Sequence, residues 1–171
     1  MTIPIEDSEP LYRPGRPLHG LSAAELFVVA SVRLWVVDVS KTRADPSDWP
    51  DWRRGMTVAG LDGEAIAAFD IAMRVIGLTA REPLPVCPPA CPRLGRGEAM
   101  VLSALALAQD DDRGGLEWQL AGMLCPTGVR IARWPLAQLS GALAEVGLTL
   151  PARRIDAGCA SERLPADATI H

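Results

Sequence analysis

The feature that most constrains this chain is an almost unbroken apolar run at residues 26–39, LFVVASVRLWVVDV. The run contains Arg33 and Asp38 and is shorter than the roughly 20 apolar residues that a transmembrane helix needs. Ser22 lies three residues before Glu25, which is the spacing of a capping box at a helix start. We therefore predict a buried, central helix over residues 22–40, although the valine-rich RLWVVDV is also compatible with a strand.

Residues 62–80 form the most clearly amphipathic segment. Asp62 is a typical N-cap residue, and an apolar stripe follows it at helical spacing. Asp70 and Arg74 are four residues apart on the opposite side, where they can form an ion pair. The pattern predicts a surface helix with one face in the core.

Three shorter segments complete the predicted helices. Residues 98–109 are rich in Ala and Leu, and residues 116–124 carry a short apolar stripe. A last helix is expected over residues 135–147, with Pro135 as its first residue and Gly147 as its C-terminal cap. The predicted fold is all-α: a small irregular bundle of about five helices with long Pro/Gly-rich loops and flexible termini.

The 171 residues suit one domain with tails. Residues 1–20 contain four prolines and are expected to be a flexible N-terminal arm. Residues 21–151 are the predicted helical domain, and residues 152–171 are expected to be a disordered tail. Proline-rich loops are expected at residues 41–60 and 81–97.

The loop sequence DWPDWRRG, residues 48–55, is the first candidate for a binding site. Trp49 and Trp52 lie three apart and are followed by Arg53 and Arg54, and exposed Trp with Arg is the composition of binding hot spots. The two indoles could equally fold back and fill a gap in the bundle. Trp52 is expected to be the buried one, and Trp49 the exposed anchor for a partner.

The second candidate is the loop sequence VCPPACP. Cys87 and Cys91 are separated by three residues, and Cys125 could supply a further thiolate for Zn²⁺ or an iron–sulfur cluster. A redox-active disulfide and two ordinary thiols are the other interpretations. Because no metal-site spacing is complete, the main expectation is that the protein has no cofactor.

Catalytic patterns are weak in this sequence. The two histidines are His19, in the predicted arm, and His171, the last residue, which makes a Ser–His–Asp arrangement improbable. The segments DWRRG, AIAAFDIAMRVI and ALAEVGLTLP are similar to those of bacterial proteins from GC-rich genomes, and this similarity implies no activity.

The net charge of −4 and the lack of a basic run argue against nucleic-acid binding. The start of the chain lacks the apolar region of a signal peptide, which favours a cytoplasmic location. We expect a partner-binding protein, an adaptor or regulatory accessory that binds another protein and can also form a homo-oligomer. A metal-binding protein and an enzyme with an unrecognised site are the alternatives.

Overall fold

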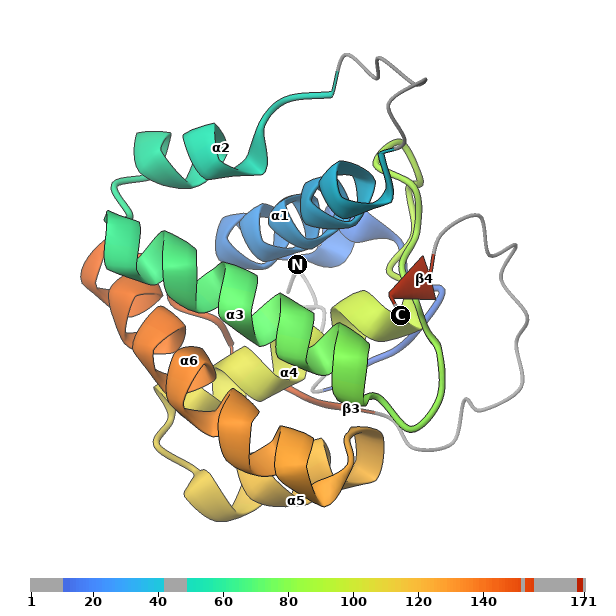
Figure 1. The fold of residues 1–171 in the computed structure, drawn as a ribbon. Coiled ribbons are helices and arrows are strands. Elements are labelled where there is room, and N and C mark those ends of the chain that lie inside the picture. Colours follow the sequence, from blue (N-terminus) through green and yellow to red (C-terminus); the bar gives the residue numbers. More distant parts are fainter. Residues whose placement is uncertain (1–10, 42–48, 152, 156–168, 171) are drawn as a thin grey trace, which may run out of the picture.

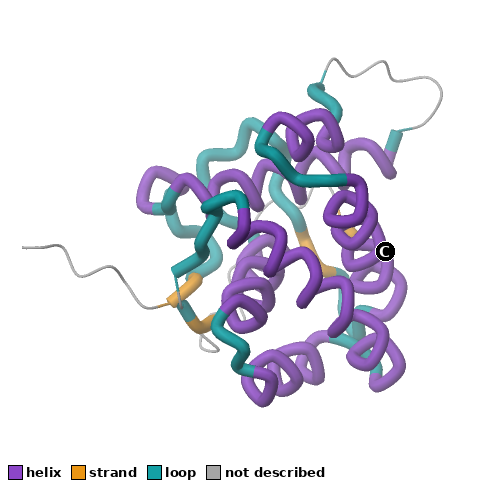
Figure 2. The backbone as a smooth tube through the Cα atoms, turned by 90° about the vertical axis from the view of Figure 1, so that its left-hand side faces the viewer, coloured by secondary structure: helices purple, strands orange, loops and turns teal. Residues whose placement is uncertain are grey.

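The computed structural model describes residues 11–41, 49–151, 153–155 and 169–170. Helices make up most of this backbone, and the strands are short (Figures 1 and 2). The helices are α1 (Ala23–Ser40), α2 (Trp52–Val58), α3 (Gly63–Thr79), α4 (Arg96–Gln109), α5 (Arg113–Met123), α6 (Pro126–Glu145) and a 3-10 turn at Leu18–Gly20. The strands are β1 (Leu11–Tyr12), β2 (Leu84–Pro85), β3 (Arg154–Ile155) and β4 (Thr169–Ile170). The all-α prediction is confirmed.

Helix α1 begins as its sequence indicates. The Ser22 hydroxyl accepts a hydrogen bond from the Glu25 backbone N–H, and the Glu25 carboxylate accepts one from the Ser22 N–H. This reciprocal capping satisfies two backbone donors that the first turn would otherwise leave free. The whole segment is helical, so the strand interpretation of RLWVVDV was wrong.

The most enclosed helix is α4 rather than α1, which corrects the prediction that the first helix is central. Side chains on every side of α4 are buried, from Ala99 to Ala106, whereas α1 exposes Leu26 and Val39. Small residues explain this difference, because Ala99 and Ala104 let neighbouring helices approach α4 closely. In Figure 1, α4 lies in the middle of the molecule behind α3.

Helices α3 and α6 lie side by side and antiparallel (Figure 1). A Cβ atom at Gly128, near the start of α6, would lie 2.6 Å from Thr79 Cβ at the end of α3. At the other end of the pair, a Cβ atom added at Gly60 would lie 3.4 Å from Val146 Cγ1. Glycine at position 128 therefore permits the close approach of the two helices.

Helix α6 is longer than the sequence indicated. The prediction of a turn at Pro126 and a helix from Pro135 was wrong, because Pro126 occupies the first turn and Pro135 lies inside the helix. Proline is accepted in a first turn, since the N–H there has no partner within the helix. An internal proline costs about 3 kcal/mol or more, and the buried face from Val129 to Leu143 against α3 and α4 offsets that cost.

The prediction of a loop over residues 41–60 was also wrong in its second half. Helix α2 begins after Asp51, whose carboxylate accepts a hydrogen bond from the Arg53 N–H. Seven residues are too few for a stable isolated helix. The burial of Trp52 and Met56 against the bundle stabilises it instead.

The packed part of the chain begins before residue 21. Tyr12 is fully buried, and backbone hydrogen bonds of 2.8 Å join Gly15 and Arg16 to Leu94. At the other end, β3 pairs in parallel with β1, and buried Arg153 lies 3.0 Å from the Glu25 carboxylate. Strand β4, also part of the predicted tail, pairs with β2 in an antiparallel arrangement. Residues 1–10, 152, 156–168 and 171, which include Cys159 and His171, lie outside the described residues.

In the part of the chain that the structure describes, no helix is long and apolar enough to cross a membrane. Arg33 interrupts the longest apolar run, and it has partners inside the protein.

Candidate functional site

Trp52 is a core residue. Its side chain is 1% exposed, and its ring centroid lies 5.2 Å from that of Phe69 on α3. The indole N–H donates a hydrogen bond of 3.1 Å to the Asp38 carboxylate at the end of α1. Trp52 therefore fastens α2 to α1 and α3 and presents no free surface to a partner.

Arg53 is also engaged within the protein. Its guanidinium lies over the Trp52 ring at 4.2 Å from the centroid and donates a 3.0 Å hydrogen bond to Asp38. Burial by itself would raise the pKa of Asp38, but the hydrogen bonds from Arg53 and Trp52 outweigh this effect and lower it. The ion pair of Arg53 with Asp38 therefore orders the start of α2, and the Arg53 guanidinium is already engaged within the protein.

Trp49 and Arg54 are the members of the predicted site that face outward. Trp49 is 45% exposed, and Arg54 is also exposed. A small cavity of about 170 Å³ lies between the end of α1 and this loop, and it is lined by Trp49, Trp52 and Arg53 but not by Arg54. The division between a buried Trp52 and an exposed Trp49 is the one expected from the sequence.

Cys87 and Cys91 lie together in the loop between β2 and α4. Cys87 is buried and Cys91 is half-buried. Burial, the Glu98 carboxylate and a hydrogen bond with the Cys91 side chain raise the pKa of the Cys87 thiol to about 12. At neutral pH the free thiol of Cys87 is therefore protonated.

Cys125 is placed elsewhere, as the N-cap of α6, where its backbone N–H donates to the Thr79 carbonyl. No group of three or more Cys, His, Asp or Glu side chains with the geometry of a metal site occurs among the described residues. The described structure therefore does not bring Cys125 to the Cys87 and Cys91 pair.

The buried ion pair of Arg33 and Glu98 forms hydrogen bonds with the loop between β2 and α4, residues 86–95, which we call the cysteine loop. Arg33 donates to the Glu98 carboxylate and to the carbonyls of Pro89, Cys91 and Arg93. The Glu98 carboxylate accepts further hydrogen bonds from the backbone N–H groups of Cys87 and Gly95. Both ends of the loop are thus bonded to one ion pair.

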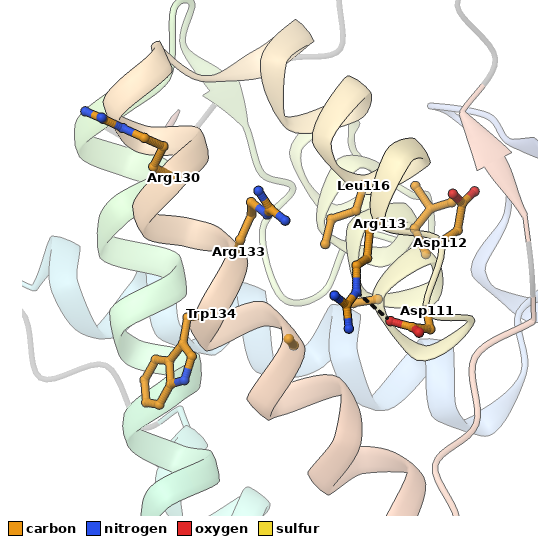
Figure 3. A pocket seen from close by; sticks show the side chains of 10 residues that line it. Asp111, Asp112, Arg113, Leu116, Arg130, Arg133 and Trp134 are labelled. Carbon is orange, nitrogen blue, oxygen red and sulfur yellow. Dashed lines mark hydrogen bonds and ion pairs between the residues drawn. The ribbon is translucent and has the colours of Figure 1, made fainter.

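An open groove of about 400 Å³ lies between the α4–α5 corner and α6, and we call it the α5–α6 groove (Figure 3). This volume is within the range of small-ligand and peptide pockets. The residues that line it are Leu107, Ala108, Asp111, Asp112, Arg113, Leu116, Arg130, Arg133, Trp134 and Ala137.

Aromatic and cationic side chains of α6 dominate one wall of the groove. In Figure 3, Arg133 extends toward the side of Arg113 and Leu116, whereas Arg130 and Trp134 extend along the other side of α6. Trp134 is 65% exposed, which leaves a large apolar surface in contact with water. Leu116 is buried and supplies apolar surface on the α5 side.

The arginines that line the groove form only exposed ion pairs or none with other described residues. Arg113 pairs with Asp111 at 3.1 Å, and Arg133 pairs with Glu117 at 3.3 Å, in both cases at the surface. Arg130 makes no ion pair with any described residue. Because exposed ion pairs contribute little stability, these cations can exchange their partners for those of a bound molecule.

The α5–α6 groove was missed in the sequence because residues 126–134 were expected to form a turn. With those residues in a helix, the spacing of three and four residues places positions 130, 133, 134 and 137 along one stretch of α6. Arg133 extends from it toward α5, and Arg130 and Trp134 extend to the other side (Figure 3). A helical interpretation from Pro126 would have placed an Arg/Trp surface there.

Comparisons with known proteins give no relative. No family model, no curated protein and no solved structure matches the chain.

Proposed function

We propose that this protein is a helical partner-binding domain, an adaptor or regulatory accessory, and that the α5–α6 groove binds a segment of another protein. The observation that carries the proposal is the exposed Trp134 beside Arg130 and Arg133 on α6, where all three residues line the open α5–α6 groove. Trp and Arg are the residue types most enriched among side chains that dominate binding energy.

The physical argument rests on what a partner would cover. A Trp side chain can bury 150–250 Å² of largely apolar surface and still donate a hydrogen bond from its indole N–H. At 65% exposure, Trp134 leaves most of that surface in water. A partner segment that covers Trp134 would remove this apolar surface from water.

The charges of the groove indicate the chemistry of the partner. Arg130 has no ion-pair partner among the described residues, and Arg133 has only an exposed one. An Arg guanidinium binds a carboxylate through two parallel hydrogen bonds. We therefore propose a partner segment in which an Asp or Glu lies close to a large apolar residue.

A peptide-display library tests this proposal without knowledge of the partner. The full chain is used as bait, and the enriched peptides are sequenced and then measured by fluorescence anisotropy. Peptides combining an acidic and a large apolar residue should be enriched, and Arg130→Ala with Trp134→Ala should weaken their binding at least tenfold.

Trp118→Ala is the matched control. Trp118 is 79% exposed on α5 and does not line the groove, so its replacement should leave the peptide affinity unchanged. Enrichment of no common motif, or equal binding by the double variant and the unmodified protein, would remove the groove as the binding surface.

Trp49 and Arg54 give a second candidate surface for the same function. Trp49 lines the small cavity beside α1, and Arg54 is exposed on α2. A Trp49→Ala variant belongs in the same binding measurement. If this substitution weakens binding and the Trp134 variant does not, the partner site lies at the start of α2.

A further inference from the structure

We propose that Cys87 and Cys91 are a reversible thiol–disulfide site, which closes to an intramolecular disulfide when the protein meets a low-molecular-weight disulfide such as oxidised glutathione. This site is independent of the partner surface proposed above. It combines a buried thiol, a half-buried thiol and a loop whose two ends are bonded to the same ion pair.

The loop geometry brings the two thiols together. The Cys91 backbone N–H donates a 2.9 Å hydrogen bond to the Pro88 carbonyl, which closes a tight turn between the cysteines. The Cys91 side chain lies close enough to the Cys87 thiol to contribute to the rise in its pKa. The turn therefore places the two thiols near each other, as a disulfide between them requires.

The ion pair of Arg33 and Glu98 fixes the backbone positions of both cysteines. The Cys87 N–H donates to Glu98 at 3.0 Å, and the Cys91 carbonyl accepts from Arg33 at 2.6 Å. Since Arg33 and Glu98 are bonded to each other, the backbones of both cysteines are tied to one rigid unit. Gly95 closes the other side, where an added Cβ would lie 3.2 Å from the Cys87 sulfur.

The different exposure of Cys87 and Cys91 determines which thiol reacts first. Cys87 is 8% exposed and Cys91 is half-buried, so an external disulfide RSSR reaches Cys91. The Cys91 sulfur, on losing its proton, attacks one sulfur of RSSR, forms a mixed disulfide and releases the first RSH. The Cys87 sulfur, on losing its proton, then attacks the Cys91 sulfur, and the bond between Cys91 and SR breaks. The departing RS⁻ takes up a proton to become the second RSH, and the protein disulfide is formed. Overall, two protein thiols are oxidised and one RSSR is reduced to two RSH.

The test uses the full chain carrying Cys125→Ser and Cys159→Ser, so that Cys87 and Cys91 are its only thiols. Serine at position 125 suits an N-cap, and circular dichroism confirms the fold. After incubation with oxidised glutathione, intact mass spectrometry should show the loss of two hydrogens with no glutathione adduct. Peptide mapping should place the disulfide between Cys87 and Cys91, and dithiothreitol should restore both thiols.

Two further variants in the same background separate the steps. Cys87→Ala should accumulate a glutathione adduct on Cys91, because no second thiol resolves it. Cys91→Ser should react at least tenfold more slowly than Cys87→Ala, because its remaining thiol is buried. The proposal is overturned if the two-cysteine protein keeps a stable adduct on Cys91, or if Cys87 and Cys91 both stay reduced while the Cys87→Ala variant is modified.

Discussion

Arg33 of α1 and Glu98 of α4 form a buried, bidentate ion pair, with Arg33 Nε 2.7 Å from Glu98 Oε1 and Nη2 3.1 Å from Oε2. The three carbonyl acceptors in the cysteine loop take the remaining N–H groups of the guanidinium. The two charges are fully enclosed, and each hydrogen-bonding position is used. This pair joins the first helix, the central helix and the loop between β2 and α4.

Loss of either partner of this ion pair should be costly. Arg33→Met or Glu98→Gln leaves a buried group without its counterpart, which we expect to lower the free energy of unfolding by about 3–5 kcal/mol. The double variant should lose less than the sum of the two single losses, because it leaves no isolated charge. Urea denaturation measures the free energy of unfolding of the two single variants and of the double variant.

The control for this cycle is Arg113→Met. Its ion pair with Asp111 lies at the surface with both side chains 80% exposed, so the urea midpoint should hardly change. A loss for Arg33→Met no larger than that of this control would contradict the buried ion pair.

The two tryptophans of the predicted binding loop should respond differently to truncation. Trp52→Ala removes a fully packed indole and its hydrogen bond to Asp38, and should cost about 3–5 kcal/mol of stability. Trp49→Ala should leave the melting temperature nearly unchanged, because this side chain is 45% exposed. Differential scanning calorimetry measures the melting temperature of both variants. Equal destabilisation would show that both indoles belong to the core.

Two glycines of α6 should give opposite results when they are replaced by alanine. Gly128→Ala places a Cβ against the Thr79 side chain and must push α3 and α6 apart, which lowers stability by about 1–3 kcal/mol. Gly141→Ala meets no atom within 4 Å and should raise stability by about 0.4–1 kcal/mol, because the unfolded chain becomes less flexible. Chemical denaturation of the two variants measures the signs, and a neutral Gly128→Ala would contradict the close helix contact.

Acid should destabilise the protein partly through Asp70. Burial alone would raise the pKa of Asp70, but hydrogen bonds from Arg74 and Trp35 outweigh it and keep this pKa below the ordinary 3.8. As the pH falls below 3.8, the unfolded carboxyl binds its proton before the folded one does, so stability decreases. The contribution of Asp70 to stability is fully present above pH 3.8 and is lost as the pH falls through the pKa of Asp70 in the folded protein.

Asp70→Asn tests this linkage, because the amide oxygen can still accept the hydrogen bond from Trp35. The variant should be less stable than the unmodified protein near neutral pH, and its urea midpoint should fall less on acidification below pH 3.8. An unchanged dependence on pH in the variant would assign the acid sensitivity to other carboxylates, of which Asp38 is the next to replace.

Features set by neighbours in the chain were accessible from the sequence. The capping of α1 by Ser22 and Glu25 involves residues three apart, and the ion pair of Asp70 with Arg74 joins residues four apart on one helix. The positive φ of Gly147 just after α6 likewise matches its predicted role as a C-terminal cap. Helix geometry alone fixes these distances, so one-dimensional spacing predicts them.

The sequence by itself therefore determined the all-α class, the capped starts of α1 and α3 and the difference between Trp49 and Trp52. Only the tertiary structure decided that α6 continues through Pro135, that α2 forms, and that Arg33 meets Glu98 across 65 residues. The same holds for the α5–α6 groove, which is lined by residues of α4, α5 and α6 and of the turn between α4 and α5. The physical reason is that burial against distant parts of the chain outweighs local preferences, and no local spacing records which segments will meet.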